Sequence, residues 1–235
     1  MIKRALASVQ QTIKALPADL PLNVTLLTDL PARCDPQSLL SSAWDELFQG
    51  LRVPGEISTT DSISMAWVEM RLKQPVRTVD VILILQLYGA DNYSDGMATL
   101  LLTSDDVADK YQLTYSARLL RPMPLDITCF KDDFRLFLDT QITASRTARI
   151  FCDRQDWRDI SAELLMVGAE KKADWLPDEI ITFEKSIGIP GPAGQWLLAV
   201  LASEIAERRN TSILTLFANE TEHFVSSVIP GNKNG

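Results

Sequence analysis

The sequence is short of the residues on which metal sites and disulfide frameworks depend. Its 235 residues include 3 cysteines and 1 histidine. The cysteines, Cys34, Cys129 and Cys152, are odd in number and irregularly spaced, which fits a reducing compartment better than a disulfide framework. No Cys-x-x-Cys pair accompanies His223, so the pattern offers no zinc-like ligand set. We therefore expect neither a metal nor another cofactor.

Basic charge and long apolar runs are scarce as well. The chain has 23 Lys and Arg against 31 Asp and Glu, for a net charge of −8. An acidic chain repels phosphate and anionic lipid, so nucleic acid and membrane surfaces are not expected partners. No apolar run approaches the roughly 18 residues that span a bilayer, and no secretory signal is visible at the N-terminus. These absences favour a cytoplasmic location, while a membrane anchor before Met1 is left open.

Motifs for phosphate binding and lipid hydrolysis are missing too. The segment Gly188–Gly194 is rich in glycine but matches neither the P-loop nor the dinucleotide-binding fingerprint. No Gly-x-Ser-x-Gly elbow occurs, which argues against the chain being a lipase itself.

The stretch around which the chain is organised runs from Ile57 to Met123 and has apolar residues at regular spacing. From Ser62 to Lys73 apolar residues recur at intervals of three to four, which predicts a helix with one apolar face. Ser62 or Asp61 is the expected N-cap, because a short side-chain oxygen can accept a first-turn amide hydrogen. The aliphatic and alternating runs that follow predict three strands, at 79–87, 97–103 and 112–120.

Helices and strands alternate on both sides of this stretch, an order typical of a layered α/β structure. Apolar spacing and proline positions predict helices at 2–16, 36–51 (capped by Asp35), 130–142, 157–167 and 192–208. Strands are expected at 22–27, 57–59, 148–152, 212–217 and 224–229, with a polar loop holding a short element at 171–185. We expect mixed β-sheet layers with helices: an N-terminal half, 1–124, and a C-terminal half, 125–235, packed on it in a single globular unit.

Most charged groups have a simple structural interpretation. Asp105 and Asp106 begin a predicted helix, where negative charge is favourable for the helix dipole. The segment 153–159 alternates in charge, which indicates a solvated face. His223 is expected to be a surface or half-buried residue and not a ligand.

Three segments resemble β-ketoacyl synthases. TTDSISMAWVEMRLKQPVRTVDVILIL is similar to the part of that family where a Thr-Ala-Cys-Ser element opens a buried helix and a strand follows. DGMATLLLTSDDVADKYQLTYSARLLRPM resembles the family's Glu-Gly-Ala-Ala strand and returning strand. IPGPAGQWLLAVLASEIAERRNTSILTLFANETEHFVSSVI resembles its Gly-His-x-x-Gly-Ala helix and closing hairpin. The resemblance covers a little under half the chain and implies a shortened thiolase-like fold.

The departures from that family concern its chemistry. Ser62 falls where the nucleophilic cysteine would be, and Gly191-Pro192 where the helix-opening histidine would be. The family uses a thiolate whose pKa a helix N-terminus lowers, whereas serine needs an adjacent base to take its proton. The resemblance therefore implies a degenerate nucleophile position at Ser62 and no catalysis.

A second resemblance concerns the role. LNVTLLTDLP, TTDSISMAWV, YSDGMATLLLTSDD and LLAVLASEIAERRNTSILTLF are similar to adaptor proteins that load lipase effectors onto the spike of type VI secretion systems. This resemblance implies a non-catalytic, chaperone-like adaptor whose partners are a lipase effector toxin and the spike protein. The alternative is a β-ketoacyl synthase-like enzyme, or its inactive partner subunit, acting on acyl thioesters. A homodimer is a further expectation of the resemblance, because thiolase-like domains often pair.

If the chain is an adaptor, we expect the partner at the sheet edge and its flanking loops, since an unpaired strand can accept another chain. The segment LYGADNYSD joins two predicted strands and carries Tyr88, Asp91, Tyr93 and Asp95 as candidate partner-binding residues. Tyrosine is favoured at interfaces because it supplies a large contact area at low entropy cost. The simpler interpretation is a surface turn whose tyrosines pack on the rim of the sheet.

Overall fold

The computed structural model describes residues 1–50, 52–73 and 77–232. Contacts divide the chain into two compact units. The first consists of Met1–Ile63, Arg71–Thr114 and Gly191–Ala193; the second consists of Ser64–Met70, Tyr115–Pro190 and Gly194–Gly235. Each unit thus combines segments from different parts of the chain. The division into halves at 1–124 and 125–235 stays a prediction.

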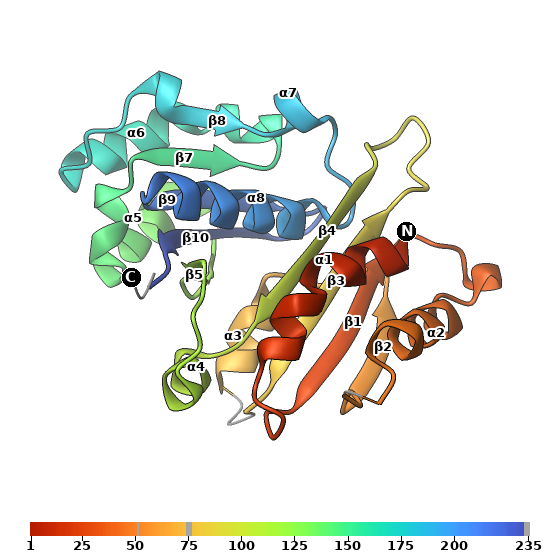
Figure 1. The fold of residues 1–235 in the computed structure, drawn as a ribbon. Helices are drawn as coiled ribbons and strands as arrows, with labels where there is room; N and C mark the ends of the chain where they lie inside the picture. The colour runs from red at the N-terminus through yellow and green to blue at the C-terminus, as the bar shows by residue number, and fades with distance from the viewer. Residues whose placement is uncertain (51, 74–76, 233–235) are drawn as a thin grey trace. The chain divides into compact units, whose positions relative to one another are not determined.

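The first unit is built on a four-stranded sheet of order β2-β1-β3-β4 (Figure 1). β1 (Leu22–Thr28) pairs in parallel with β2 (Glu56–Thr60) and with β3 (Val79–Gln86), and β4 (Gly96–Leu102) pairs antiparallel to β3. Seven of the eight β3 residues are buried, the burial expected of an aliphatic strand with a neighbour on each side. The predicted strands at 22–27, 57–59, 79–87 and 97–103 are thereby confirmed.

Two helices cover one face of this sheet. α1 (Ile2–Ala15) and α2 (Pro36–Phe48) contact each other and the strands, and their buried side chains form one core with those of β1 and β3: Leu6, Ile13, Trp44, Phe48, Val24, Leu26, Val81 and Leu83. The Asp35 side chain accepts the Ser38 N–H at 3.2 Å, so the predicted N-cap of α2 is confirmed. The predicted end of this helix, Leu51, lies outside the described residues. α4 (Asp105–Tyr111) begins at its Ser104 cap, with Asp105 and Asp106 in its first turn as expected.

The second unit holds a six-stranded sheet of order β5-β10-β9-β7-β8, with β6 also paired to β10. The strands are β5 (Ala117–Leu119), β6 (Met123–Pro124), β7 (Arg149–Cys152), β8 (Ile180–Thr182), β9 (Ile213–Ala218) and β10 (His223–Pro230). β7 is parallel to β8 and β9, whereas β10 is antiparallel to its neighbours. The carboxyl ends of three parallel strands therefore share one edge of this sheet.

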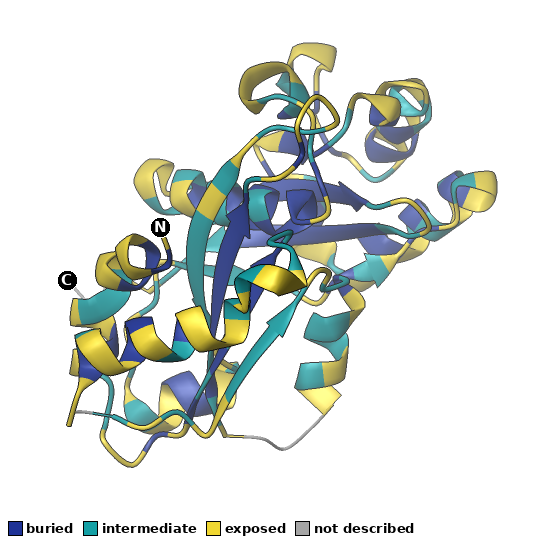
Figure 2. Cartoon of the chain, turned by 90° about the vertical axis from the view of Figure 1, so that its right-hand side faces the viewer, coloured by how far each residue is buried: buried dark blue, intermediate teal, exposed yellow. Residues whose placement is uncertain are grey.

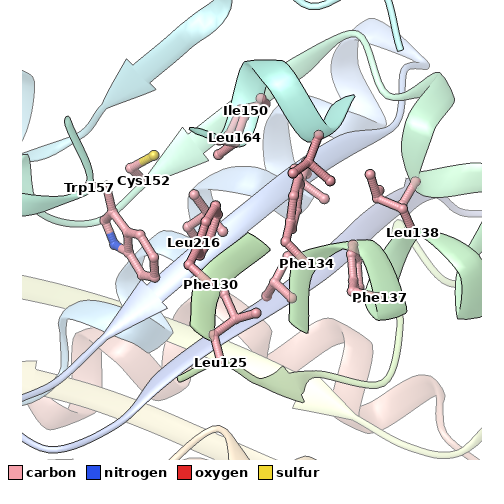
Figure 3. Packing of buried hydrophobic residues seen from close by; sticks show 14 of the residues in the cluster. Leu125, Phe130, Phe134, Phe137, Leu138, Ile150, Cys152, Trp157, Leu164 and Leu216 are labelled. Atoms are coloured by element: carbon pink, nitrogen blue, oxygen red, sulfur yellow. The ribbon is translucent and has the colours of Figure 1, made fainter. Parts of the chain in front are cut away.

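Helices α5 (Phe130–Thr140) and α6 (Ser161–Glu170) form the main core of the second unit with the sheet. Figure 3 shows their aromatic and aliphatic side chains converging on the strands, with Phe130, Phe134 and Leu164 facing Leu216. α8 (Gly194–Arg209) contacts β5, β9 and β10, and α7 (Glu184–Ile187) is short. The central strands are buried while the helices expose their outer sides (Figure 2). The predicted helices at 130–142 and 192–208 and the strands at 148–152, 212–217 and 224–229 are confirmed, with ends that shift by up to two residues.

Three expectations about the elements need correction. α3 (Ala66–Lys73) begins four residues after Ser62, so neither Ser62 nor Asp61 is its N-cap. The predicted strand 112–120 is only β5, because Gln112 adopts a left-handed conformation (φ 51°) that ends α4. The predicted helix 157–167 is a 3₁₀ turn, Gln155–Arg158, followed by α6. The short element expected within the polar loop 171–185 is β8, which joins the sheet beside β7.

Candidate functional site

The polar residues nearest the start of α3 form the first part of a candidate site in the second unit. Ser64 Oγ accepts the Ala66 N–H at 3.1 Å and donates a hydrogen bond to Glu222 Oε2 at 2.6 Å. Asn219 Nδ2 donates to the same carboxylate oxygen at 3.1 Å, and the Asn219 Oδ1 accepts the Glu222 N–H at 2.8 Å. The turn between β9 and β10 is thus held to the segment that leads into α3 by a hydroxyl–carboxylate contact between residues 158 positions apart.

Asp153 anchors the same end of the sheet from inside. It follows β7, is 2% exposed, and accepts the Ala218 N–H at 2.7 Å and the Trp157 indole N–H at 2.9 Å. Burial raises the pKa of Asp153 to about 6, since these donors offset only part of the desolvation of the carboxylate. The expectation that 153–159 forms a solvated face is therefore wrong at Asp153 and Trp157, which are both buried.

His223 packs against the Trp157 indole. The two rings pack edge to face, with centroids 5.4 Å apart and an interplanar angle of 88°. Burial lowers the pKa of His223, the positive charge of Arg154 lowers it further, and Asp156 opposes both effects. The imidazole is half-buried, and the group that it contacts is the Trp157 indole, which is not a nucleophile.

The three thiols have different surroundings. Cys152 is fully buried at the end of β7, and burial, reinforced by the negative charge of Asp153, raises its pKa far above the range of a reactive thiolate. Cys129 is exposed and Cys34 is half-buried. Among the described residues, no three His, Cys, Asp or Glu side chains gather in a way that would hold a metal ion.

The arrangement therefore offers one hydroxyl with a carboxylate acceptor. A carboxylate can act as a general base for a hydroxyl, but it lacks the basicity of an imidazole, so Ser64 is a weak nucleophile at neutral pH. Ser62, the nucleophile position predicted from the sequence, is exposed and donates to Asp61 Oδ1 at 3.3 Å.

The candidate partner-binding residues lie in the first unit, in the loop between β3 and β4. Asp29, directly after β1, accepts hydrogen bonds from the N–H groups of Leu87 (2.9 Å) and Tyr88 (2.7 Å) and from the Tyr93 hydroxyl (3.1 Å). Burial and the Asp29 carboxylate raise the pKa of Tyr93. Tyr93 is therefore turned toward the sheet, whereas Tyr88 is 54% exposed.

The same loop is closed from a second direction. Gln86, which is buried, donates to the Ser94 carbonyl at 2.7 Å and accepts the Ala193 N–H at 3.1 Å. A side chain at Gly191 would collide with Gln86 and with the Tyr93 ring. The remaining candidates, Asp91 and Asp95, are exposed. The loop is thus fixed on its inner side and presents Tyr88, Asp91 and Asp95 outward.

Several solved structures superpose on this chain over nearly its whole length. A tetronic acid condensing enzyme, AbyA1, superposes with a TM-score of 0.59 over 98% of this chain and 85% of its own, at 13% identity. A type II polyketide ketosynthase, bound to its acyl-carrier protein and a hexaketide, gives a TM-score of 0.62 over 97% and 81%, at 11% identity. MvaS with 3-hydroxy-3-methylglutaryl coenzyme A gives 0.52 over 97% and 70%, at 14% identity.

The chain has a thiolase-like fold. The expected fold class, a mixed α/β arrangement in a shortened thiolase-like form, is confirmed. No family model and no characterised protein sequence matches the chain, so the likeness to condensing enzymes is one of fold alone. Along the described ranges, no helix combines the length and apolarity needed to cross a membrane.

Sequence reasoning missed three residues of the site. Ser62 and Ser64 carry the same functional group, so the sequence did not show which of the two lies beside the first residue of α3, Ala66. Asp153 was grouped with the exposed charges that follow it, although its place directly after the apolar run 150–152 was a signal of burial. Glu222 gave no signal, because its contact with Ser64 is formed by tertiary structure.

Proposed function

We propose that this chain is a non-catalytic adaptor that binds a lipase effector of a type VI secretion system and helps to load it onto the spike protein, in the cytoplasm. The observation that carries the proposal is the β3–β4 loop, which Asp29 and Gln86 fix on its inner side while Tyr88 is exposed on its outer side. His223 packs on Trp157 and the Cys152 thiol is fully buried, so neither group is placed as the base or nucleophile of an acyl transfer.

The finer identity of the partners rests on the sequence resemblance to lipase-effector adaptors. An adaptor needs a rigid surface, because ordering a loop on binding costs affinity. The loop held by Asp29 and Gln86 meets this requirement, and its outward residues Tyr88, Asp91 and Asp95 are the proposed contacts. In this proposal Tyr93 supports the loop through its hydrogen bond to Asp29.

The test measures binding of the purified chain to a purified phospholipase effector and to its spike protein by isothermal titration calorimetry. We expect binding of both, with the effector affinity reduced at least tenfold in Tyr88→Ala, the scale of a buried aromatic contact. Tyr111→Ala serves as the matched control on a different element of the same unit. Absence of binding to either protein refutes the adaptor function, and unchanged affinity in Tyr88→Ala refutes only the proposed contact surface.

The second candidate is an enzyme acting on acyl thioesters, or its inactive partner subunit. The observation in its favour is the 2.6 Å hydrogen bond from Ser64 Oγ to Glu222, which supplies a base to a hydroxyl at the start of α3. Incubation with acyl-CoA and malonyl-CoA tests it, with Ser64→Ala and Glu222→Gln against Ser62→Ala. Turnover that is lost in the first two variants and kept in the third establishes the enzyme and removes the non-catalytic proposal.

A further inference from the structure

The carboxyl-terminal end of α8 borders an open hollow in the second unit. It has a volume of about 420 Å³, which falls within the range of small-ligand sites, about 300–1,000 Å³. Its lining is polar and comes from three segments: Ser116, Glu207, Asn210, Pro230, Gly231 and Asn232. The side chains of these lining residues include one carboxylate, two amides and one hydroxyl.

Backbone geometry forms one wall of this hollow. The Gly231 N–H donates to the Ser116 carbonyl at 2.8 Å, just past the end of the β5–β10 pairing. A β-carbon at Gly231 would lie 1.8 Å from the Tyr115 carbonyl oxygen, so no side chain fits there. Asn210, another lining residue, follows the last residue of α8 and adopts the left-handed conformation, with φ 49°.

The negative charge of Glu207 is unfavourable for the dipole of its own helix, α8. It lies in the last turn of α8, where the free carbonyls carry partial negative charge and where a cation would be favourable. Its helical neighbours at three and four positions are Ser203, Glu204, Asn210 and Thr211, none of them basic. Arg208 is paired with Glu204 instead.

A half-buried carboxylate at a helix C-terminus, among the polar residues that line an open hollow, is suited to an external cation. We propose that this hollow, lined by Ser116, Glu207, Asn210 and Asn232, binds the guanidinium of an arginine side chain from a partner protein. The planar five-donor fork of arginine matches several acceptors set around one space better than the point charge of lysine does. The inference rests on the proposed partner-binding function and names the chemistry of one contact.

The first experiment needs no partner protein. The full chain is titrated with N-acetyl-arginine amide, and binding is followed by NMR shifts of the side-chain amides of Asn210 and Asn232. N-acetyl-citrulline amide, which has nearly the same shape without the charge, is the ligand control. We expect saturable shifts with the arginine probe and at least fivefold weaker binding of citrulline, the scale of one solvent-exposed ion pair.

Two matched variants test the role of the carboxylate. Glu207→Gln is expected to weaken the arginine probe about fivefold, whereas Glu204→Gln, one turn earlier on the same helix and paired with Arg208, leaves its affinity unchanged. Equal binding of citrulline, an unaffected Glu207→Gln variant, or equal losses in both variants each overturn the site.

A second arm separates this site from the adaptor function. Glu207→Gln is expected to weaken binding of the purified effector or spike protein, and the arginine probe is expected to compete with that partner. If the probe binds but the partner affinity is unchanged in Glu207→Gln, the proposed occupant is wrong. If neither partner binds the wild-type chain, the adaptor function fails, while the probe titration still decides whether the hollow accepts a guanidinium.

Discussion

Replacing Asp153 by asparagine should change how the stability of the chain depends on pH. The carboxylate is 2% exposed and has a pKa of about 6, compared with an ordinary value of 3.8. The folded state therefore binds a proton more tightly than the unfolded state does between these two values. Stability from this group is complete below about pH 4 and is lost as the pH rises through about 6. A shift of roughly two pKa units corresponds to ~3 kcal/mol.

The substitution also changes the hydrogen bonds. Asparagine keeps one oxygen for either the Trp157 indole or the Ala218 N–H, and presents an NH₂ group to the other donor. Leaving one buried donor without an acceptor costs about 1–3 kcal/mol. We therefore expect Asp153→Asn to be less stable than the wild type by about 1–3 kcal/mol at pH 4, and at pH 7 to be as stable as the wild type or up to ~2 kcal/mol more stable.

Urea unfolding at pH 4, 5, 6 and 7, followed by far-UV circular dichroism, measures this difference. Other groups that titrate in this range, His223 among them, occur in both proteins, so their contributions largely cancel in the difference. Arg154 and Cys152, which lie next to Asp153 in the chain, are also common to both. A difference between the two proteins that stays constant from pH 4 to pH 7 would refute the reasoning.

Three further predictions concern single contacts. Asp29→Ala leaves three donors of the β3–β4 loop without their acceptor and should lower the unfolding free energy by about 2–3 kcal/mol, while Asp91→Ala in the same loop changes it by less than ~0.5 kcal/mol in urea denaturation. Arg71→Met breaks a largely buried ion pair with Asp80 and should cost about 2–3 kcal/mol, measured in the same assay; a loss below ~0.5 kcal/mol would show that water replaces the guanidinium. The His223 imidazole should titrate by NMR with a midpoint below 6.5, so stability linked to it is lost as the pH falls below that value; a midpoint above 6.5 contradicts its desolvation.

Most of the fold followed from local pattern. β3 and β9 are apolar runs flanked by turn residues, and α1 repeats its apolar residues at helical spacing, so burial and backbone preference agree. The Asp35 cap followed from a short carboxylate placed before proline. In these segments each residue's own preference and its final environment point the same way.

The start of α3 was predicted four residues too early. Ser62 and Ser64 are both good capping residues, and periodicity alone does not distinguish between them. The two serines differ in their contacts, because Ser64 donates a hydrogen bond to Glu222 in the turn between β9 and β10. The loop of Tyr88 and Tyr93 presents the same problem, since Asp29 determines which tyrosine turns inward.

The sequence by itself determined the order of most helices and strands, the α/β class and the absence of a histidine or cysteine just before α3, because these depend on residue type and on spacing over a few turns. Tertiary structure alone decided that Asp153 is buried with a pKa of about 6, that Ser64 meets Glu222, and that Glu207 faces a hollow. Such contacts join residues that are remote in the chain, and their energies depend on burial and distance.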